Sequence, residues 1–322
     1  CIRDRAVTMH TTTQARVREF EGINMMHRLS VMFIVILFAA SMAVAAEPAP
    51  AAATSTDGVS DPVNLSVFPE QIELTTSRDF QSVIAVVRRS DDVTLDVTEA
   101  ATWKLADESF ARLEGNKILP VADGETELIC QHVAGEVRIP VKVSRSSETL
   151  PVSFEKDIVP ILTRSGCNTG SCHGAASGKD GFMISLFGYD PAGDYQRITR
   201  QIGMRRINLA IPEESLFLTK ATGKVNHTGG KLFGEDSVYY SMVLEWLNTG
   251  APADPEPPPK VAKLEIYPPQ SVIEGEGSTQ RFVSVAHYAD GTTRDVTNLS
   301  AFKTNTATSA AVDNDGHVTA GA

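Results

Sequence analysis

The sequence predicts several domains, with a small all-α domain between two all-β sandwiches. The 322 residues are too many for one ordinary core and suit two or three domains. Short runs rich in β-branched residues, separated by Asp, Gly and Ser turns, occupy 63–146 and return over 263–322. Between these β segments, over 152–251, the apolar residues follow a helical period instead.

The composition is that of a globular protein, with 42% hydrophobic residues, 21% charged residues and a formal net charge of −11. An acidic chain is a poor partner for nucleic acid or for an anionic membrane surface, so we expect no nucleic-acid partner. Such a surface can still dock a basic redox protein. The simplest explanation of the charge is ordinary solvation of a secreted protein.

The N-terminal region has the pattern of a signal peptide. Arg28 precedes an apolar run over 31–38, and small residues follow at 43–45. We therefore expect residues 1–46 to comprise upstream residues plus a signal peptide cleaved after Ala45 or Ala46, with export to the periplasm or the cell surface. An uncleaved N-terminal anchor is the alternative.

The two β segments are copies of one another. An ungapped shift of 199 residues places Pro69 on Pro268 and the segment 96–98 on 295–297, with Asp, Val and Thr in both. This pattern indicates an internal repeat of one domain, and we expect the second copy, 263–322, to be truncated.

Two helices are expected in the middle domain. Ser153 can cap the first, in which Pro160 implies a kink or a short first helix, and Ser237 can cap the last, which Gly250 would end. Two linkers flank these parts, a tether rich in Ala, Pro, Ser and Thr over 47–62 and a Pro-rich linker over 252–262.

Two thiols and an imidazole follow the first predicted helix. Four residues separate Cys167 from Cys172, and His173 follows directly. Covalent haem attachment requires this set, because thioethers fix the porphyrin edge while the adjacent imidazole reaches the iron. The usual spacing has two residues between the cysteines, so the longer spacing needs a looped segment, for which Gly170 is suited. We predict one covalent haem c per chain, bound by Cys167, Cys172 and His173.

Two other interpretations of the cysteines stay open. In an oxidising compartment Cys167 and Cys172 could form a disulfide. A zinc site is less favoured, because no second pair of ligands accompanies them. Cys130 stands in a β run and is expected to be buried.

The middle segment resembles the planctomycete-type cytochrome c domain. The resemblance lies in 154–162, in the Cys-x4-Cys-His-Gly motif, in 212–217 and in 246–251. It implies an all-α cytochrome c-like haem domain that transfers electrons. In that family, such domains accompany Ig-like modules in exported multidomain proteins.

Both β segments resemble the bacterial Ig-like (group 2) domain, through 66–69 and 265–268 at the first strand and through the tracts 290–297 and 315–320. Such modules serve as spacers or as docking surfaces for cell-surface or protein partners. The expected architecture is therefore an Ig-like sandwich, a cytochrome c-like haem domain and a second Ig-like sandwich.

The sixth iron ligand is expected to be His227. The resembled family often has a Met-Pro-Pro element at this place, whereas this chain has His227 followed by Thr-Gly-Gly. His173 and His227 would then hold the metal, with Met204, Met183 or a merely exposed His227 as alternatives. Arg205 and Arg206 are candidates for pairing with haem propionates.

Electron transfer through a bound haem is thus the expected function, with a redox partner that the sequence does not identify. The alternative is a surface adhesion or scaffold protein that has a Cys167–Cys172 disulfide and no haem. No catalytic constellation stands out, so we expect this segment to be an electron carrier and not an enzyme; a catalytic region in a missing C-terminal part is the alternative.

Overall fold

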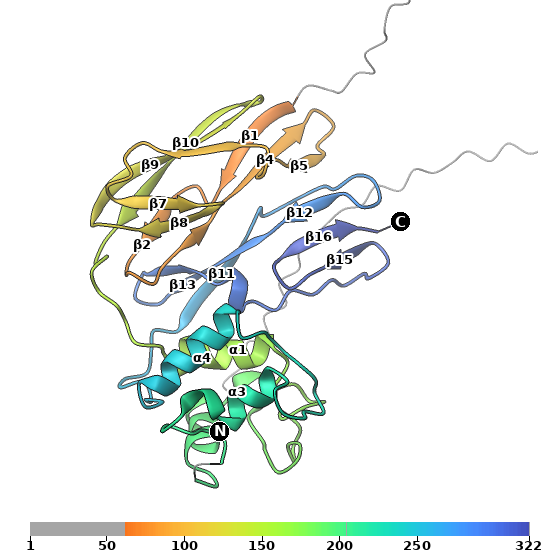
Figure 1. Cartoon of the computed structure of the whole chain (residues 1–322). Helices are drawn as coiled ribbons and strands as arrows, with labels where there is room; N and C mark the ends of the chain where they lie inside the picture. The colour runs from red at the N-terminus through yellow and green to blue at the C-terminus, as the bar shows by residue number, and fades with distance from the viewer. Residues whose placement is uncertain (1–61, 204, 322) are drawn as a thin grey trace, which may run out of the picture.

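The computed structural model describes residues 62–321 with the exception of Met204 (Figure 1). The predicted signal peptide and most of the tether lie outside the described residues. Within them the chain is mostly β, with strands in five sheets of three or four strands and four short α-helices. Figure 1 shows two β modules side by side and the middle segment at one end of the pair.

The N-terminal β module contains three sheets, with strand orders β1-β4-β5, β2-β10-β9-β6 and β3-β8-β7. Alternating apolar residues of these strands form its core, in which Ile118, Leu128 and Cys130 are fully buried. The strands are β1 (Pro62–Phe68), β2 (Ile72–Leu74), β3 (Gln81–Ser82), β4 (Ile84–Arg89), β5 (Thr94–Asp96), β6 (Thr102–Leu105), β7 (Ala111–Glu114), β8 (Lys117–Pro120), β9 (Gly124–His132) and β10 (Gly135–Val143).

The C-terminal β module repeats part of this arrangement, with strand orders β11-β13-β14 and β12-β16-β15. Under the shift of 199 residues, β1, β4 and β5 fall on β11, β13 and β14, and both copies have a cis proline, at Pro69 and at Pro268. The strands are β11 (Val261–Tyr267), β12 (Thr279–Arg281), β13 (Val283–Tyr288), β14 (Thr293–Asp295), β15 (Ala310–Val312) and β16 (His317–Ala320).

The middle segment corrects the predicted fold class. It has four α-helices, of six, nine, six and eleven residues, joined by turns and long loops, so the expected all-α cytochrome c-like domain is wrong. Twelve glycines between 166 and 234 keep these helices short, because glycine opposes helix propagation. The helices are α1 (Val159–Arg164), α2 (Pro191–Thr199), α3 (Leu216–Ala221) and α4 (Val238–Asn248).

Both predicted helix caps are confirmed. Ser153 Oγ accepts from the Lys156 backbone N–H at 3.0 Å, and Ser237 Oγ accepts from the Tyr240 N–H at 3.2 Å. Ser153 caps the π-helical turn Phe154–Ile158, which runs directly into α1, so Pro160 lies in the first turn of α1 and no kink is needed.

The middle segment packs on the C-terminal β module through a shared core. Phe154 and Trp246 are buried at its centre, and Leu299 of the β module joins the same cluster. Asp157 forms an ion pair with Arg294 of β14 at 2.7 Å. The helices and this module therefore form a continuous structure.

The two β modules pair with approximate two-fold symmetry. Asp295 Oδ2 accepts from the Ser82 backbone N–H at 2.7 Å, and Asp96 Oδ2 accepts from the Arg281 N–H at 2.8 Å. Ser82 and Arg281 are equivalent under the 199-residue shift, as are the two aspartates. The rings of Phe68 and Tyr267, another equivalent pair, also stack, with centroids 5.8 Å apart. The repeat thus forms its own interface, as a homodimer would.

Within the described residues, none of the helices combines the length and the apolar character that crossing a bilayer requires.

We predict that Asp295→Ala weakens the pairing of the two β modules. The substitution leaves the amides of Ser82 and Thr297, which the carboxylate binds, without their acceptors, so the free energy of unfolding should fall by about 1–3 kcal/mol. Urea unfolding measures the change. Asp315→Ala, which removes an exposed carboxylate from the same module, is the control and should have little effect. Equal stability of the Asp295 variant and the unsubstituted protein would contradict the role of this contact.

Candidate functional site

A cavity of about 270 Å³ opens in the middle segment. Its wall contains all four residues that the motif analysis selected: Cys167, Cys172, His173 and His227. Ten of the twenty other lining residues are apolar, and six of these come from the helices: Ile161 and Leu162 of α1, Leu216, Phe217 and Ala221 of α3, and Val243 of α4. The site therefore combines two thiols and two imidazoles with an apolar wall.

The cysteine loop begins where α1 ends. Gly166 takes φ +75°, the left-handed conformation common after a helix C-terminus. Cys167 N–H then donates to the Leu162 carbonyl at 2.8 Å, and His173 N–H donates back to the Cys167 carbonyl at 2.9 Å. The four residues between the cysteines, two more than usual, are thus accommodated in a compact loop that returns His173 beside Cys167.

A close backbone contact explains why glycine follows the histidine. A Cβ at Gly174 would lie 2.1 Å from the Asn168 carbonyl oxygen. Asn168 is itself buried and donates its side-chain amide to Thr163 Oγ1 at 2.9 Å, which ties the loop to α1. Only glycine fits at position 174 without displacing this backbone.

Both cysteines are free thiols, without a disulfide between them. Burial raises the pKa of the Cys167 thiol to about 12, so this thiol is protonated at neutral pH. A protonated thiol is a poor metal ligand and a poor nucleophile for disulfide exchange. Burial likewise raises the pKa of Cys130 to about 11, and its expected burial is confirmed.

The tautomer of His173 is set by a backbone carbonyl. Its Nδ1 lies 3.0 Å from the Phe182 carbonyl oxygen, and because a carbonyl only accepts, Nδ1 carries the proton. Burial lowers the pKa of His173, which favours the neutral ring. The lone pair is then on Nε2, the arrangement that a metal-binding imidazole uses.

A backbone carbonyl also sets the tautomer of His227, which lies in a different loop. It begins a tight turn in which Gly230 N–H donates to the His227 carbonyl at 2.8 Å, and its Nδ1 lies 2.9 Å from the Gly230 carbonyl oxygen. A Cβ at Gly229 would be 2.9 Å from His227 Cε1, so the glycine allows the backbone to pass under the ring. His227 therefore also has Nε2 as its free nitrogen.

The two imidazoles are nearly parallel. Their ring centroids are 6.3 Å apart and their planes differ by 7°. Among the described residues, no three His, Cys, Asp or Glu side chains come together as a metal-binding group. The arrangement is thus a pair of nitrogens, with the two thiols elsewhere on the wall of the same cavity.

The other candidates differ in placement. Arg205 is exposed and lines the cavity, whereas Arg206 is buried and uses its guanidinium on backbone carbonyls. Met183 is not among the lining residues, and Met204 lies outside the described residues. Met242 packs against the core of the segment.

Sequence reasoning missed Phe182. Its carbonyl orients His173, and its ring lies 4.6 Å from the imidazole of His173, centroid to centroid. Nothing in a sequence pattern marks a residue that acts through its carbonyl. A hint was the Asp180-Gly181 pair, typical of a tight turn, which forms a short hairpin between Lys179 and Phe182.

No protein-family model matches the chain, and no curated protein matches it.

We predict that Gly174→Ala distorts the cysteine loop. A methyl group pressed into the Asn168 carbonyl should lower the free energy of unfolding by about 1–3 kcal/mol. Denaturant unfolding followed by the fluorescence of buried Trp246 reports the change. Gly170→Ala is the control in the same loop, since its Cβ would meet only Leu186, at 3.9 Å, and the expected change is within about 0.5 kcal/mol. Similar losses in both variants would contradict the contact.

Proposed function

We propose that this chain is an exported electron-transfer protein that carries one covalently attached haem c in the cavity of the middle segment. Cys167 and Cys172 would form the thioethers, and His173 and His227 the two axial ligands. The observation that carries the proposal is the pair of parallel imidazoles, 6.3 Å apart, on the same cavity as two free thiols.

The spacing of the imidazoles suits a single metal ion. An imidazole nitrogen binds a first-row metal at about 2.0–2.1 Å and the ring centre lies roughly 1 Å behind it, so one ion between two rings sets their centroids roughly 6 Å apart. Both Nδ1 atoms are committed to backbone carbonyls, which leaves both Nε2 atoms available. The residues present therefore fit an iron with two histidine ligands.

The thiols and the apolar wall suit the porphyrin. Each thioether forms when a thiol adds across a vinyl group, with sulfur bonded to one carbon and the proton transferred to the other, so no net oxidation is needed. The protonated state of Cys167 is compatible with this addition. The aliphatic and aromatic wall from α1, α3 and α4 excludes water from the ring faces.

Two imidazoles at the iron favour electron transfer over substrate chemistry. When bound, the haem supplies a one-electron ferric–ferrous couple. If His173 and His227 both held the iron, neither would leave its place open for a substrate. Histidine in place of methionine should hold the reduction potential lower than in a His/Met centre, because a thioether ligand raises it.

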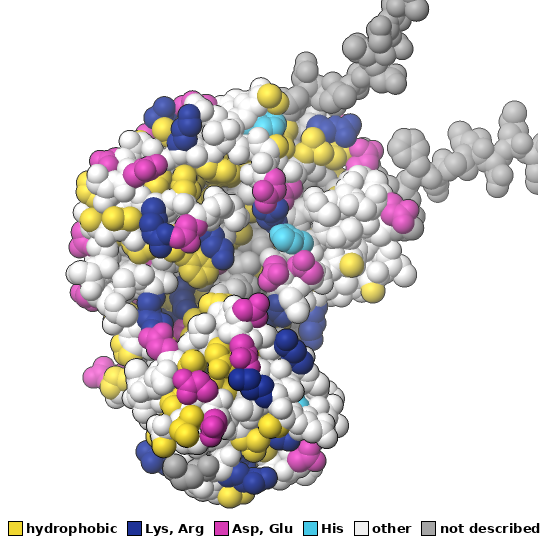
Figure 2. Space-filling view, in the orientation of Figure 1, with side chains coloured by type: hydrophobic (Ala, Val, Ile, Leu, Met, Phe, Trp, Pro, Cys, Tyr) yellow, Lys and Arg dark blue, Asp and Glu magenta, His cyan; other side chains and the backbone are white. Residues whose placement is uncertain are grey.

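The β modules would then hold the haem segment and provide docking surfaces. The middle segment has ten Lys and Arg residues and ten Asp and Glu residues, so the net charge of −11 resides in the flanking segments. Figure 2 shows basic, acidic and apolar side chains interspersed on the lobe that the middle segment forms. A redox partner that approaches this lobe would meet no strong field of one sign.

We predict that the protein, made in a host that matures c-type cytochromes, retains haem on a denaturing gel. Peroxidase staining of the protein band measures attachment. Cys167→Ser combined with Cys172→Ser should abolish the stain, because a hydroxyl forms no thioether. Cys130→Ala, at the fully buried cysteine of the N-terminal module, should keep it. An unstained native band would instead favour the scaffold interpretation.

We predict that the ferric haem is low-spin and that His227→Ala makes it high-spin, because one axial position opens. The visible absorption spectrum reports the change, and cyanide or carbon monoxide should then bind rapidly. His132→Ala, in the N-terminal module, should keep the native spectrum. A low-spin spectrum in the His227 variant would assign the sixth position to another residue, with Met204 the next to test.

A further inference from the structure

Arg206 is a buried cation on the wall of the cavity. Its exposed fraction is 7%, and its guanidinium lies 4.5 Å from the centre of the Phe182 ring. That ring in turn lies 4.6 Å from the imidazole of His173, so the guanidinium is within about 9 Å of the imidazole centre. Few side chains in proteins are buried with a full charge unless something compensates it.

Backbone carbonyls, and not carboxylates, satisfy the donors of Arg206. Nη1 donates to the carbonyls of Arg197 and Gln201 at 2.9 and 2.6 Å, and Nη2 to that of Gly181 at 3.3 Å. These carbonyls belong to the end of α2, the loop after it and the 179–182 hairpin. The hydrogen bonds hold the guanidinium in place but leave its charge unneutralised.

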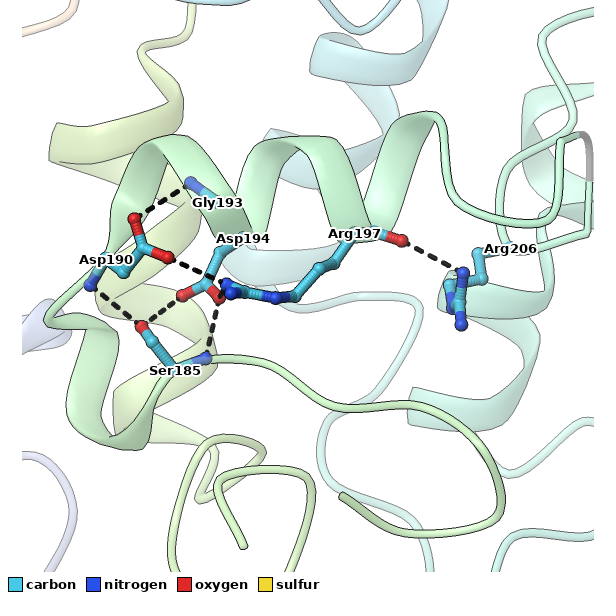
Figure 3. A network of polar contacts seen from close by, with 6 residues as sticks. All are labelled: Ser185, Asp190, Gly193, Asp194, Arg197 and Arg206. Atoms are coloured by element: carbon cyan, nitrogen blue, oxygen red, sulfur yellow. Dashed lines mark hydrogen bonds and ion pairs between the residues drawn. The ribbon is translucent and has the colours of Figure 1, made fainter. Parts of the chain in front are cut away.

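The acidic residues around α2 pair with another arginine. Asp190 and Asp194 both pair with Arg197, at 3.1 and 2.9 Å, and Asp194 also binds Ser185 (Figure 3). Figure 3 shows Arg206 joined to this network only through the Arg197 carbonyl. Within the described part of the chain, no carboxylate forms an ion pair with Arg206. Burial lowers its pKa and Arg205 lowers it further, as expected for a cation without a counter-charge.

We propose that Arg206 sets the reduction potential of the haem site by supplying a fixed, unneutralised positive charge beside the cavity. This inference rests on the proposed haem function. When the iron accepts one electron, the centre gains one negative charge, which a nearby cation stabilises. Because the guanidinium is buried, salt screens this interaction less than it screens an exposed charge. The carbonyls of α2 and of the hairpin keep the charge close to His173.

The same hydrogen bonds use three of the five guanidinium N–H donors of Arg206, both on Nη1 and one on Nη2. The propionate pairing expected from the sequence would be limited to Nε and the remaining Nη2 hydrogen. We assign Arg206 a role through its charge, at a distance, while Arg205 is the exposed arginine on the cavity wall.

The test is redox titration of the haem-loaded full chain. Arg206→Gln should shift the ferric–ferrous equilibrium roughly tenfold toward the ferric state, a fall in potential of about 59 mV for one electron. Arg200→Gln removes an equal charge from an exposed position at the end of α2 and should leave the potential unchanged. The shift caused by Arg206→Gln should persist at high salt. An unchanged potential in Arg206→Gln, or an equal fall in Arg200→Gln, would overturn the proposal.

A second variant keeps the test decisive if Arg206→Gln does not fold. Arg206→Lys retains the charge, but a buried amine can lose its proton in the alkaline range whereas arginine cannot. The potential of Arg206→Lys should therefore show a downward step with rising pH that the unsubstituted protein lacks. Identical pH profiles for the two proteins would reject the role of Arg206. Haem staining of the unsubstituted protein distinguishes this result from failure of the proposed haem function. If that protein does not stain, the proposed function itself is wrong and no potential can be measured.

Discussion

The hydrogen bond from His173 Nδ1 to the Phe182 carbonyl is the interaction on which the arrangement of the site depends. It determines the tautomer of His173 and so leaves Nε2 as the free ring nitrogen. It also joins the cysteine loop to the 179–182 hairpin, and the ring of Phe182 connects that hairpin to Arg206. One contact thereby couples the imidazole, the thiol-bearing loop and the buried cation, although the three come from separate parts of the segment.

Local features of the middle segment were predictable from the sequence, and its fold class was not. Ser153 and Ser237 cap turns where the pattern places them, because capping needs only a hydroxyl and the next few amides. The Cys and His motif lines one cavity with His227. The helical period, however, says nothing of helix length, and the glycines from 166 to 234 divide the segment into short helices and loops. Phe182 escaped prediction because it acts through its own backbone carbonyl. Arg206 was a candidate, but its hydrogen bonds to carbonyls of residues distant in sequence, such as Gly181, leave no sequence pattern.

The C-terminal β module is more than a spacer, because its residues contact the middle segment directly. Arg294 of the C-terminal module pairs with Asp157 beside the helices, and Leu299 completes the core around Trp246. Lys156 of the middle segment also lies over the ring of Tyr288, 4.2 Å from its centre. The Pro-rich stretch over 252–262 thus connects parts that are already in contact. Forces or partners acting on the β pair would be transmitted to the middle segment as to a single body.

The way the two repeats meet leaves their sequences free to diverge. Asp96 and Asp295 bind backbone amides, and the residues that own those amides are as different as Ser82 and Arg281. An amide is present whatever the side chain, proline excepted. Substitutions at Ser82 and Arg281 therefore need no matching change across the interface at these two contacts, where only the aspartates are constrained. A duplicated domain with this form of contact can lose most of its resemblance to its twin while the pair still assembles.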